Sequence, residues 1–190
     1  ISKIIKNKFK IDYPISIVNI GGITNVTQIK DSLNNLNQNF FAYDIAPGNC
    51  LIDEWVRMHL NMSYDKNGNY ASSGKVDNLI LNQAIDNFEL KSFNNSLDVK
   101  DFDLSFAKGL SFEDGCATIT KFTAFLISNG LEKISKKNNI SLNNIILCGG
   151  GRKNIFLIKS VREFLNDSNI KIKDIDNYNF DGNFIESQAF

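Results

Sequence analysis

The first quarter of the chain alternates apolar and polar positions in the way that half-buried β-strands do. This alternation runs through residues 15–20 and again through residues 23–29. The glycine pair at 21–22 between them predicts a hairpin turn. After a polar loop, residues 40–43 form a third strand that ends at Asp44. The chain is therefore expected to open with three consecutive strands in a meander.

Later segments carry apolar residues at intervals of three and four, which predicts helices. These are residues 50–60 with Asn49 as N-cap, 76–88, 117–131 with a break or bend at Asn129-Gly130, 154–165, and the beginning of a last helix at 183–190. Two short apolar segments, 144–148 and 170–172, predict a buried strand and an edge strand. Residues 65–73 and 91–106 predict irregular structure.

Three leading strands followed by alternating helices and strands indicate an α/β domain of the ribonuclease-H-like (actin-like ATPase) fold. We expect a mixed sheet that begins with a three-strand meander and is flanked by helices. Residues 1–190 are expected to form a single domain, with a helical insert at about 61–110.

Charge and cysteine content exclude several functional classes. The 21 basic and 21 acidic side chains give a formal net charge of zero, which argues against broad binding to nucleic acid or anionic membranes. The 3 cysteines have no spacing typical of a zinc or redox motif, so we expect no metal ligands and a reducing, cytoplasmic location. No segment approaches the roughly 18 consecutive apolar residues of a membrane span.

Three glycine-containing turns, each at the end of a predicted strand, carry the candidate chemistry. They are residues 19–25, 44–49 and 148–154. Glycines allow backbone N–H groups to approach phosphate oxygens, and an acid at a strand end can accept a proton from an attacking water. Three such turns in one small chain point to nucleotide chemistry.

Each candidate residue also has a purely structural interpretation. Asp44 is either a general base or a cap on the turn into the next helix. Gly21, Gly22 and Asn25 form either a phosphate-binding turn or an ordinary type I′ hairpin.

The glycine triplet has the same two interpretations. Gly149, Gly150 and Gly151, with Asn154, either let adenosine lie against the backbone or form a tight strand-to-helix turn. Arg152 either meets a phosphate or lies at a solvated helix start.

The order of these motifs resembles the C-terminal half of the anhydro-N-acetylmuramic acid kinase family. Its N-I-G-G-I-A-N motif is similar to residues 19–25, with Thr24 for Ala, and its D-T-G-P-G-N motif to residues 44–49, with Ile45 and Ala46 at the second and third positions. Its Y-D-x-x-G-x-x-A-x-x-G-x-V, C-G-G-G-x-x-N and E-A-x-A-F motifs are similar to residues 64–76, 148–154 and 186–190. Its P-K-S-T-G-R-E-x-F motif is only weakly matched at residues 95–102, which leaves sugar specificity open.

The resemblance implies an ATP-dependent kinase that opens the anhydro ring of its amino sugar with water and phosphorylates the sugar. ATP with Mg²⁺ and the amino sugar are then the expected partners, and a homodimer is left open. Asp44 would be the general base, and Gly48 with Asn49 would shape the loop around the sugar or the γ-phosphate. The remaining residues would bind the nucleotide: Gly21, Gly22, Asn25, Gly149, Gly150, Gly151 and Asn154.

Two alternatives remain at this point: another sugar or acid kinase of the same superfamily, and a non-catalytic nucleotide-binding module. The family's opening G-T-S-x-D-G loop has no counterpart in these residues, so we expect a fragment of a longer protein that is inactive alone. Ala46 stands where the family has glycine, and a left-handed backbone there would cost free energy.

Overall fold

The core of the molecule is a five-stranded mixed sheet with the order β3-β2-β1-β4-β5. The computed structural model describes residues 11–31, 39–88, 96–179 and 181–182. The strands are β1 (Ile15–Ile20), β2 (Ile23–Ile29), β3 (Phe40–Pro47), β4 (Asn144–Cys148) and β5 (Lys171–Asp174). The pairs β1–β2 and β2–β3 are antiparallel, whereas β1–β4 and β4–β5 are parallel. The leading three-strand meander is therefore confirmed.

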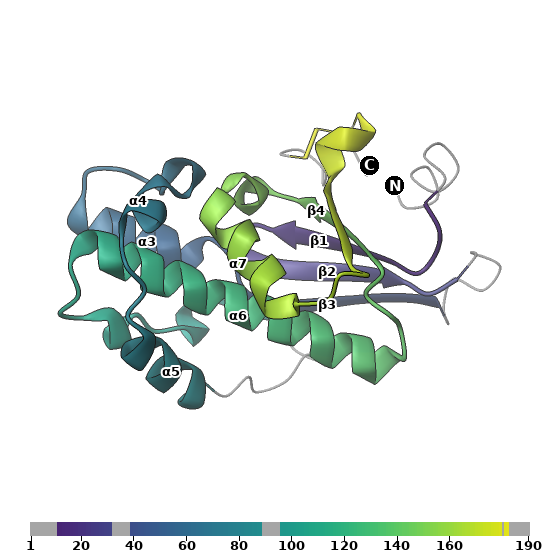
Figure 1. The fold of residues 1–190 in the computed structure, drawn as a ribbon, viewed down its shortest axis with the longest axis horizontal. Helices are drawn as coiled ribbons and strands as arrows, with labels where there is room; N and C mark the ends of the chain where they lie inside the picture. Colours follow the sequence, from purple (N-terminus) through teal and green to yellow (C-terminus); the bar gives the residue numbers. More distant parts are fainter. Residues whose placement is uncertain (1–10, 32–38, 89–95, 180, 183–190) are drawn as a thin grey trace.

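The α-helices pack on one face of this sheet and extend beyond its end (Figure 1). The α-helices are α3 (Cys50–His59), α4 (Asn69–Ser73), α5 (Asn78–Asp86), α6 (Phe112–Asn138) and α7 (Ile155–Leu165). The 3₁₀ helices are η1 (Lys66–Gly68), η2 (Val99–Asp101), η3 (Ser105–Ala107), η4 (Gly150–Lys153) and η5 (Ile175–Tyr178). The long helix α6 contacts α3, α4, α5, α7 and β3. None of the helices in the described ranges combines the length and apolarity needed to cross a bilayer.

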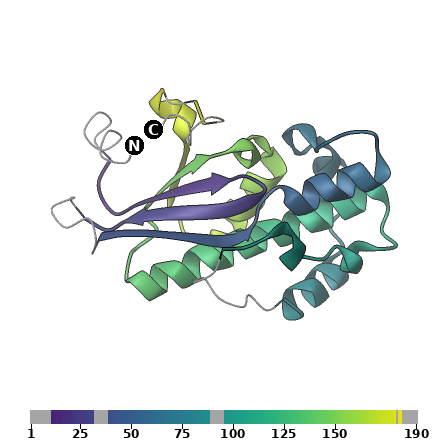
Figure 2. The same cartoon turned by 180° about the vertical axis from the view of Figure 1, so that it is seen from behind.

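The alternation of β1 divides its side chains between two hydrophobic clusters. Val18 and Ile20 face the larger cluster, which they share with Ile119 and Ile127 of α6. Ile15 points to the opposite side of the sheet, where it joins a smaller cluster with Ile146, Cys148, Ile175 and Tyr178. Figure 2 shows the face of β1, β2 and β3 that α6 does not cover. Burial on both faces fixes the register of β1, because a slip of one residue would exchange the two sets.

Residues 66–73 are helical, although the sequence predicts a loop there. They form η1 and α4 because the buried Asp65 carboxylate accepts hydrogen bonds from the N–H groups of Tyr70 (2.9 Å) and Ala71 (3.0 Å). This capping by a side chain five and six residues away is not visible in apolar periodicity. The next helix, predicted over 76–88, begins at Asn78 because Asp77 caps it by accepting from the N–H groups of Leu79 and Ile80.

The predicted break in the long helix is wrong: α6 runs without interruption through Asn129-Gly130. Gly130 lies where α6 crosses β3, and a Cβ there would come within 2.9 Å of the Ile45 carbonyl oxygen. The glycine therefore permits close packing of helix on strand, which offsets its low helix propensity. The last predicted helix, at 183–190, lies outside the described residues.

Strand β3 continues three residues past Asp44 because a bulge restores its pairing with β2. Asp44 pairs with Asn25, and Ala46 pairs with Thr24, so Ile45 is the extra residue. Ala46 is fully buried and is not among the described residues with positive φ. The free-energy cost expected for alanine at this position is therefore not incurred.

Candidate functional site

The turn between β1 and β2 is fastened to the start of α3 by backbone hydrogen bonds. The N–H groups of Gly48 and Cys50 donate to the Gly22 carbonyl at 2.8 Å and 3.2 Å, and the Asn49 N–H donates to the Gly21 carbonyl at 2.7 Å. A Cβ on Gly48 would lie 2.2 Å from the Gly21 oxygen, so glycine is required there for close approach. Asn49 occupies the N-cap position of α3, but its side chain makes no capping hydrogen bond.

The structure shows that this turn is not type I′. Neither Gly21 nor Gly22 has the positive φ that such a turn requires at both central positions. Gly22 is exposed, and a Cβ there would meet no atom within 4 Å. Packing therefore does not require glycine at this position, and the missing side chain leaves open space beside the turn.

The three consecutive glycines after β4 differ in what they do. Gly149 has φ +80°, and a Cβ on it would lie 2.4 Å from Asn19 Oδ1. A Cβ on Gly151 would lie 2.2 Å from Ile20 Cγ2. Gly150 has an ordinary φ, and its nearest contact would be Asn49 Nδ2 at 3.8 Å. Two of the glycines are therefore structural, and the middle one leaves open space.

Asn154 caps helix α7. Its Oδ1 accepts a hydrogen bond from the Leu157 N–H at 2.9 Å, and the residue is buried. A Cβ on Gly68 would lie 2.2 Å from the same Oδ1, so η1 packs directly on this cap. Asn154 thereby fixes the position of η4 and Gly150 relative to η1 and α4.

Asp44 lies beside Asn25 on one face of the sheet, because directly paired residues of antiparallel strands point the same way. Asn19 of β1 pairs with Asn25 in turn, which extends this polar row across three strands. The half-buried Asp44 carboxylate does not cap the turn into α3. Its Oδ2 instead accepts a hydrogen bond from the Leu97 N–H at 3.1 Å, so the segment that precedes η2 contacts the predicted base.

Arg152 neither meets solvent nor lies open to a phosphate. Its guanidinium is 1% exposed and pairs with Asp174 (Nε to Oδ1, 3.1 Å) and Asp176 (Nη2 to Oδ2, 2.6 Å). Its Nη1 donates to the Gly149 carbonyl at 2.8 Å. The side chain thus links the glycine triplet to β5 and η5, and no local sequence pattern indicates these partners.

We expect Arg152→Met to destabilise the fold by about 2–4 kcal/mol, because the variant loses a buried, charge-assisted network. The cost stays below that of a fully buried pair, since the side chains of Asp174 and Asp176 are 37% and 49% exposed and can be solvated. Urea denaturation followed by circular dichroism measures the change. Lys153→Met, at the exposed neighbouring position, is the matched control and should stay within about 0.5 kcal/mol. Equal midpoints for the two variants would contradict the structural role.

A cleft of about 600 Å³ opens between α3, η1 and η4. Three of the predicted residues line it: Asn49, Gly150 and Asn154. Asp44, Asn25, Gly21 and Gly22 do not line it. The cleft also brings together polar and charged side chains that the sequence reasoning missed, namely Asp53, Arg57, Ser63, Tyr64, Asp65, Lys66, Asn67 and Lys153.

Among the side chains that line this cleft, Asp53 has a shifted pKa. Burial raises its pKa from 3.8 to about 6, the charge of Arg57 opposes this shift, and the charge of Asp65 adds to it. In the sequence Asp53 is merely an acid in the first turn of a helix, which is the ordinary favourable position for a negative charge. Only its placement in the cleft distinguishes it.

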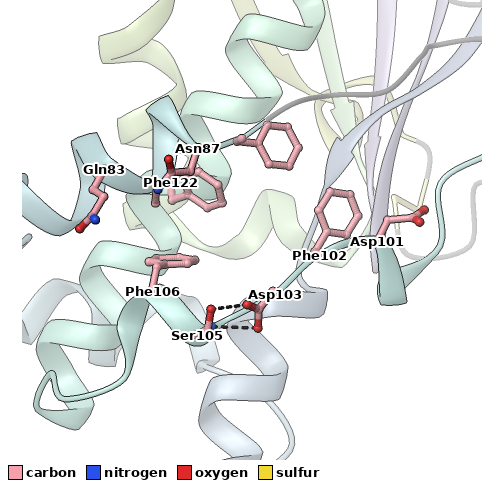
Figure 3. Close-up of a pocket in the computed structure, with 10 residues that line it drawn as sticks. Gln83, Asn87, Asp101, Phe102, Asp103, Ser105, Phe106 and Phe122 are labelled. Atoms are coloured by element: carbon pink, nitrogen blue, oxygen red, sulfur yellow. Dashed lines mark hydrogen bonds between the residues drawn. The ribbon is translucent and has the colours of Figure 1, made fainter.

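A second cavity, of about 690 Å³, lies between α5, α6 and the segment that carries η2 and η3 (Figure 3). Phenylalanine rings form its apolar part, and Phe122 contacts Phe88 and Phe106 with centroids 5.8 Å and 5.0 Å apart. Asp103, on its rim, accepts hydrogen bonds from the Ser105 N–H and hydroxyl. None of the predicted site residues lines this cavity.

The strand order, the antiparallel β2 and the glycine turns after β1 and β4 define a domain of the ribonuclease-H-like, actin-like ATPase class. Among solved structures, the activator of 2-hydroxyisocaproyl-CoA dehydratase from Clostridium difficile with bound ADPNP aligns with a TM-score of 0.51 and 15% identity. The alignment covers 86% of this chain and 55% of that one, and it confirms the predicted fold.

The chain belongs to the anhydro-N-acetylmuramic acid kinase family, whose model matches residues 10–190. It is 50% identical over 187 residues to the anhydro-N-acetylmuramic acid kinase of Pelagibacter ubique, covering 97% of this chain and 48% of that protein. The Zymomonas mobilis kinase of the same name is 31% identical over 179 residues, covering 94% and 46%. The chain thus spans about half the length of the curated relatives it matches.

Proposed function

We propose that the whole protein is an ATP-dependent kinase that acts on 1,6-anhydro-N-acetylmuramic acid. Water would open the anhydro ring while the sugar's 6-oxygen receives the γ-phosphoryl group, giving N-acetylmuramic acid 6-phosphate for recycling of peptidoglycan. The observation that carries this proposal is the family match over residues 10–190, with a relative of that name at 50% identity. The three buried cysteines, none of which forms a disulfide, favour a reducing cytoplasm as the location.

We further propose that this half of the protein contributes most of the nucleotide site. Gly21, Gly22 and Gly150 are the turn glycines at which a Cβ would make no close contact, and they follow the neighbouring parallel strands β1 and β4. Ligands of open α/β sheets bind beyond the carboxyl ends of such strands. The phosphates would therefore lie over the Gly22 turn, and the nucleoside would enter the cleft that Gly150 lines. The ADPNP bound to the dehydratase activator supports a purine nucleotide.

Magnesium would accompany the nucleotide and neutralise its β- and γ-phosphates. In the described part of the chain no three His, Cys, Asp or Glu side chains converge as a metal cluster. These residues therefore suit a Mg²⁺ ion that would be held largely by phosphates and water, which is how proteins usually bind Mg²⁺.

Asp44 is the proposed general base. The Leu97 N–H fixes one carboxylate oxygen, so the other can accept the proton of an attacking water. Asn25, beside it in the sheet, would orient that water or the phosphates. Asn49, at the start of α3 and on the cleft wall, would approach the nucleotide, whereas the buried Gly48 would act by letting the two turns meet.

The test is ADP release by the full-length gene product, given ATP, Mg²⁺ and 1,6-anhydro-N-acetylmuramic acid. Turnover that depends on this sugar is the expected result. Turnover with a competing sugar instead would assign a different kinase of the superfamily. A folded, ATP-binding protein with no turnover on any sugar would point to a non-catalytic nucleotide-binding module and would overturn the proposal.

Gly22→Ala and Gly150→Ala should each weaken ATP binding by about tenfold or more, or about 1.4 kcal/mol, while leaving the fold intact. A methyl group at either position has space in the protein but would occupy the path of the ligand. Calorimetric titration of the full-length variants with ATP measures the first effect. Melting without nucleotide measures the second, where a change within about 0.5 kcal/mol is expected. Unchanged ATP affinity in both variants would place the nucleotide elsewhere.

A further inference from the structure

The Asp53 carboxylate lines the cleft without a hydrogen-bond donor from the described residues. Its neighbours are engaged elsewhere. The Asp65 oxygens accept from the N–H groups of Tyr70 and Ala71, and the Arg57 guanidinium donates to the Ser63 carbonyl at 3.4 Å. No salt bridge of 4 Å or less joins Arg57 to Asp53, although they are one turn apart on α3.

A half-buried carboxylate without a donor is unfavourable to the fold. Burying a charged group costs free energy unless hydrogen bonds replace its water, and the raised pKa reflects this cost. Asparagine or serine would fill the same position without the charge. An arrangement that retains an unsatisfied acceptor in a cleft is typical of functional sites, where the missing donor comes from the ligand.

The chemistry of the cleft restricts what that donor can be. An anionic group would be repelled by Asp53, so the part of the ligand beside it must be neutral or cationic and must carry O–H or N–H groups. Lys66 and Lys153 also line the cleft and can attract an anion. A ligand with paired hydroxyls at one end and phosphates at the other satisfies both requirements.

We propose that Asp53 is the specificity-determining residue for the ribose of the nucleotide, accepting hydrogen bonds from its 2′- and 3′-hydroxyls. This inference rests on the proposed function, in which the nucleoside enters this cleft. Two adjacent hydroxyls match the two oxygens of one carboxylate, whereas the exocyclic amine of adenine presents a single nitrogen. Removing the hydroxyls should leave the acceptor unpaired, which is how a polar site rejects an analogue.

The experiment is a cycle of ligand and residue changes in the full-length protein, measured by calorimetric titration. The wild type should bind ATP at least tenfold more tightly than 2′,3′-dideoxy-ATP. Asp53→Ala should weaken ATP binding by a similar factor and should leave dideoxy-ATP binding nearly unchanged. Glu54→Ala, at the next position of α3 and outside the cleft lining, is the matched control and should bind both ligands as the wild type does.

Three results would overturn the inference. Asp53→Ala could weaken the binding of ATP and dideoxy-ATP equally, or could weaken the binding of neither. Each of these outcomes would show that Asp53 does not contact the hydroxyls. Equal binding of ATP and dideoxy-ATP by the wild type would exclude the hydroxyls, and a preference for ATP over inosine triphosphate that Asp53→Ala loses would assign Asp53 to the base instead. Absence of any nucleotide binding by the wild type is a separate outcome, because it contradicts the proposed function itself.

Melting without nucleotide gives an independent readout. The folded-state pKa of Asp53, about 6, lies above 3.8, so the folded chain holds this proton more tightly than the unfolded chain and loses stability as pH rises between these values. Asp53→Asn should therefore melt higher than the wild type above about pH 6, and this advantage should vanish near pH 4. The titratable and charged groups that share the cleft are Arg57, Tyr64, Asp65, Lys66 and Lys153. A lower melting temperature for Asp53→Asn across this pH range would show that the carboxylate is structurally satisfied and would contradict the inference.

Discussion

Replacement of Asp44 by asparagine in the full-length protein is expected to lower kcat for sugar phosphorylation by about 10²–10⁴-fold, the range typical for loss of a general base. Asparagine keeps an oxygen that can accept the Leu97 N–H, so the local structure should survive. It cannot accept the proton of an attacking water at neutral pH. The measurement is ADP release at saturating ATP and sugar, with the apparent affinity for ATP expected to change little.

Asp86→Asn is a suitable control for this experiment, because it makes the same chemical change at an exposed position on α5. It should retain wild-type kcat. A loss in Asp44→Asn that appears mainly as a raised KM would indicate that Asp44 binds the sugar. A kcat within threefold of the wild type would remove Asp44 from the chemistry and require a base from another part of the protein.

Gly149→Ala is expected to destabilise the fold by about 3–5 kcal/mol, combining backbone strain with overpacking. The residue has φ +80°, and its Cβ would lie 2.4 Å from Asn19 Oδ1 and 2.6 Å from the Ile20 carbonyl oxygen. Because the Ile20 carbonyl belongs to the backbone of β1, it cannot yield without disturbing the centre of the sheet. Denaturant unfolding without nucleotide measures the effect.

Gly150→Ala provides the matched comparison, since it makes the same substitution one residue later in open space. The two variants should therefore separate stability from binding, with Gly149→Ala weakening the fold and Gly150→Ala weakening the nucleotide site. If Gly149→Ala unfolds at the same denaturant concentration as Gly150→Ala, the close packing of this turn on β1 would be refuted.

Local sequence pattern was sufficient to locate the five strands of the sheet. Alternation in residues 15–20 and 23–29 reports burial directly, because side chains of a strand alternate between two faces. The amphipathic pattern of 155–165 located α7 for the same kind of reason. The pattern failed where distant groups decide the backbone, as at residues 66–73, whose helix depends on the buried Asp65 carboxylate.

For the candidate site, too, the sequence predicted local features but not contacts between distant residues. Glycine-rich turns after strands are local signals, so the sequence located the turns at 21–22 and 149–151 and the acid at Asp44. It could not divide the glycine triplet into structural and open positions, because that depends on how closely Ile20 and Asn49 approach. Its interpretations of Arg152 were wrong because the partners, Asp174 and Asp176, are more than twenty residues away along the chain.

The sequence by itself determined the order of the strands and of the main helices along the chain, the family and the positions of the glycine turns, because short periodicities and motifs indicate each of these. The tertiary structure alone decided that Asn25 stands beside Asp44, that Arg152 is buried between two carboxylates, and that Asp53 faces a cleft in which no described residue donates a hydrogen bond to it. Burial, desolvation and hydrogen bonding depend on which segments meet in space, and no local pattern of side chains contains that information.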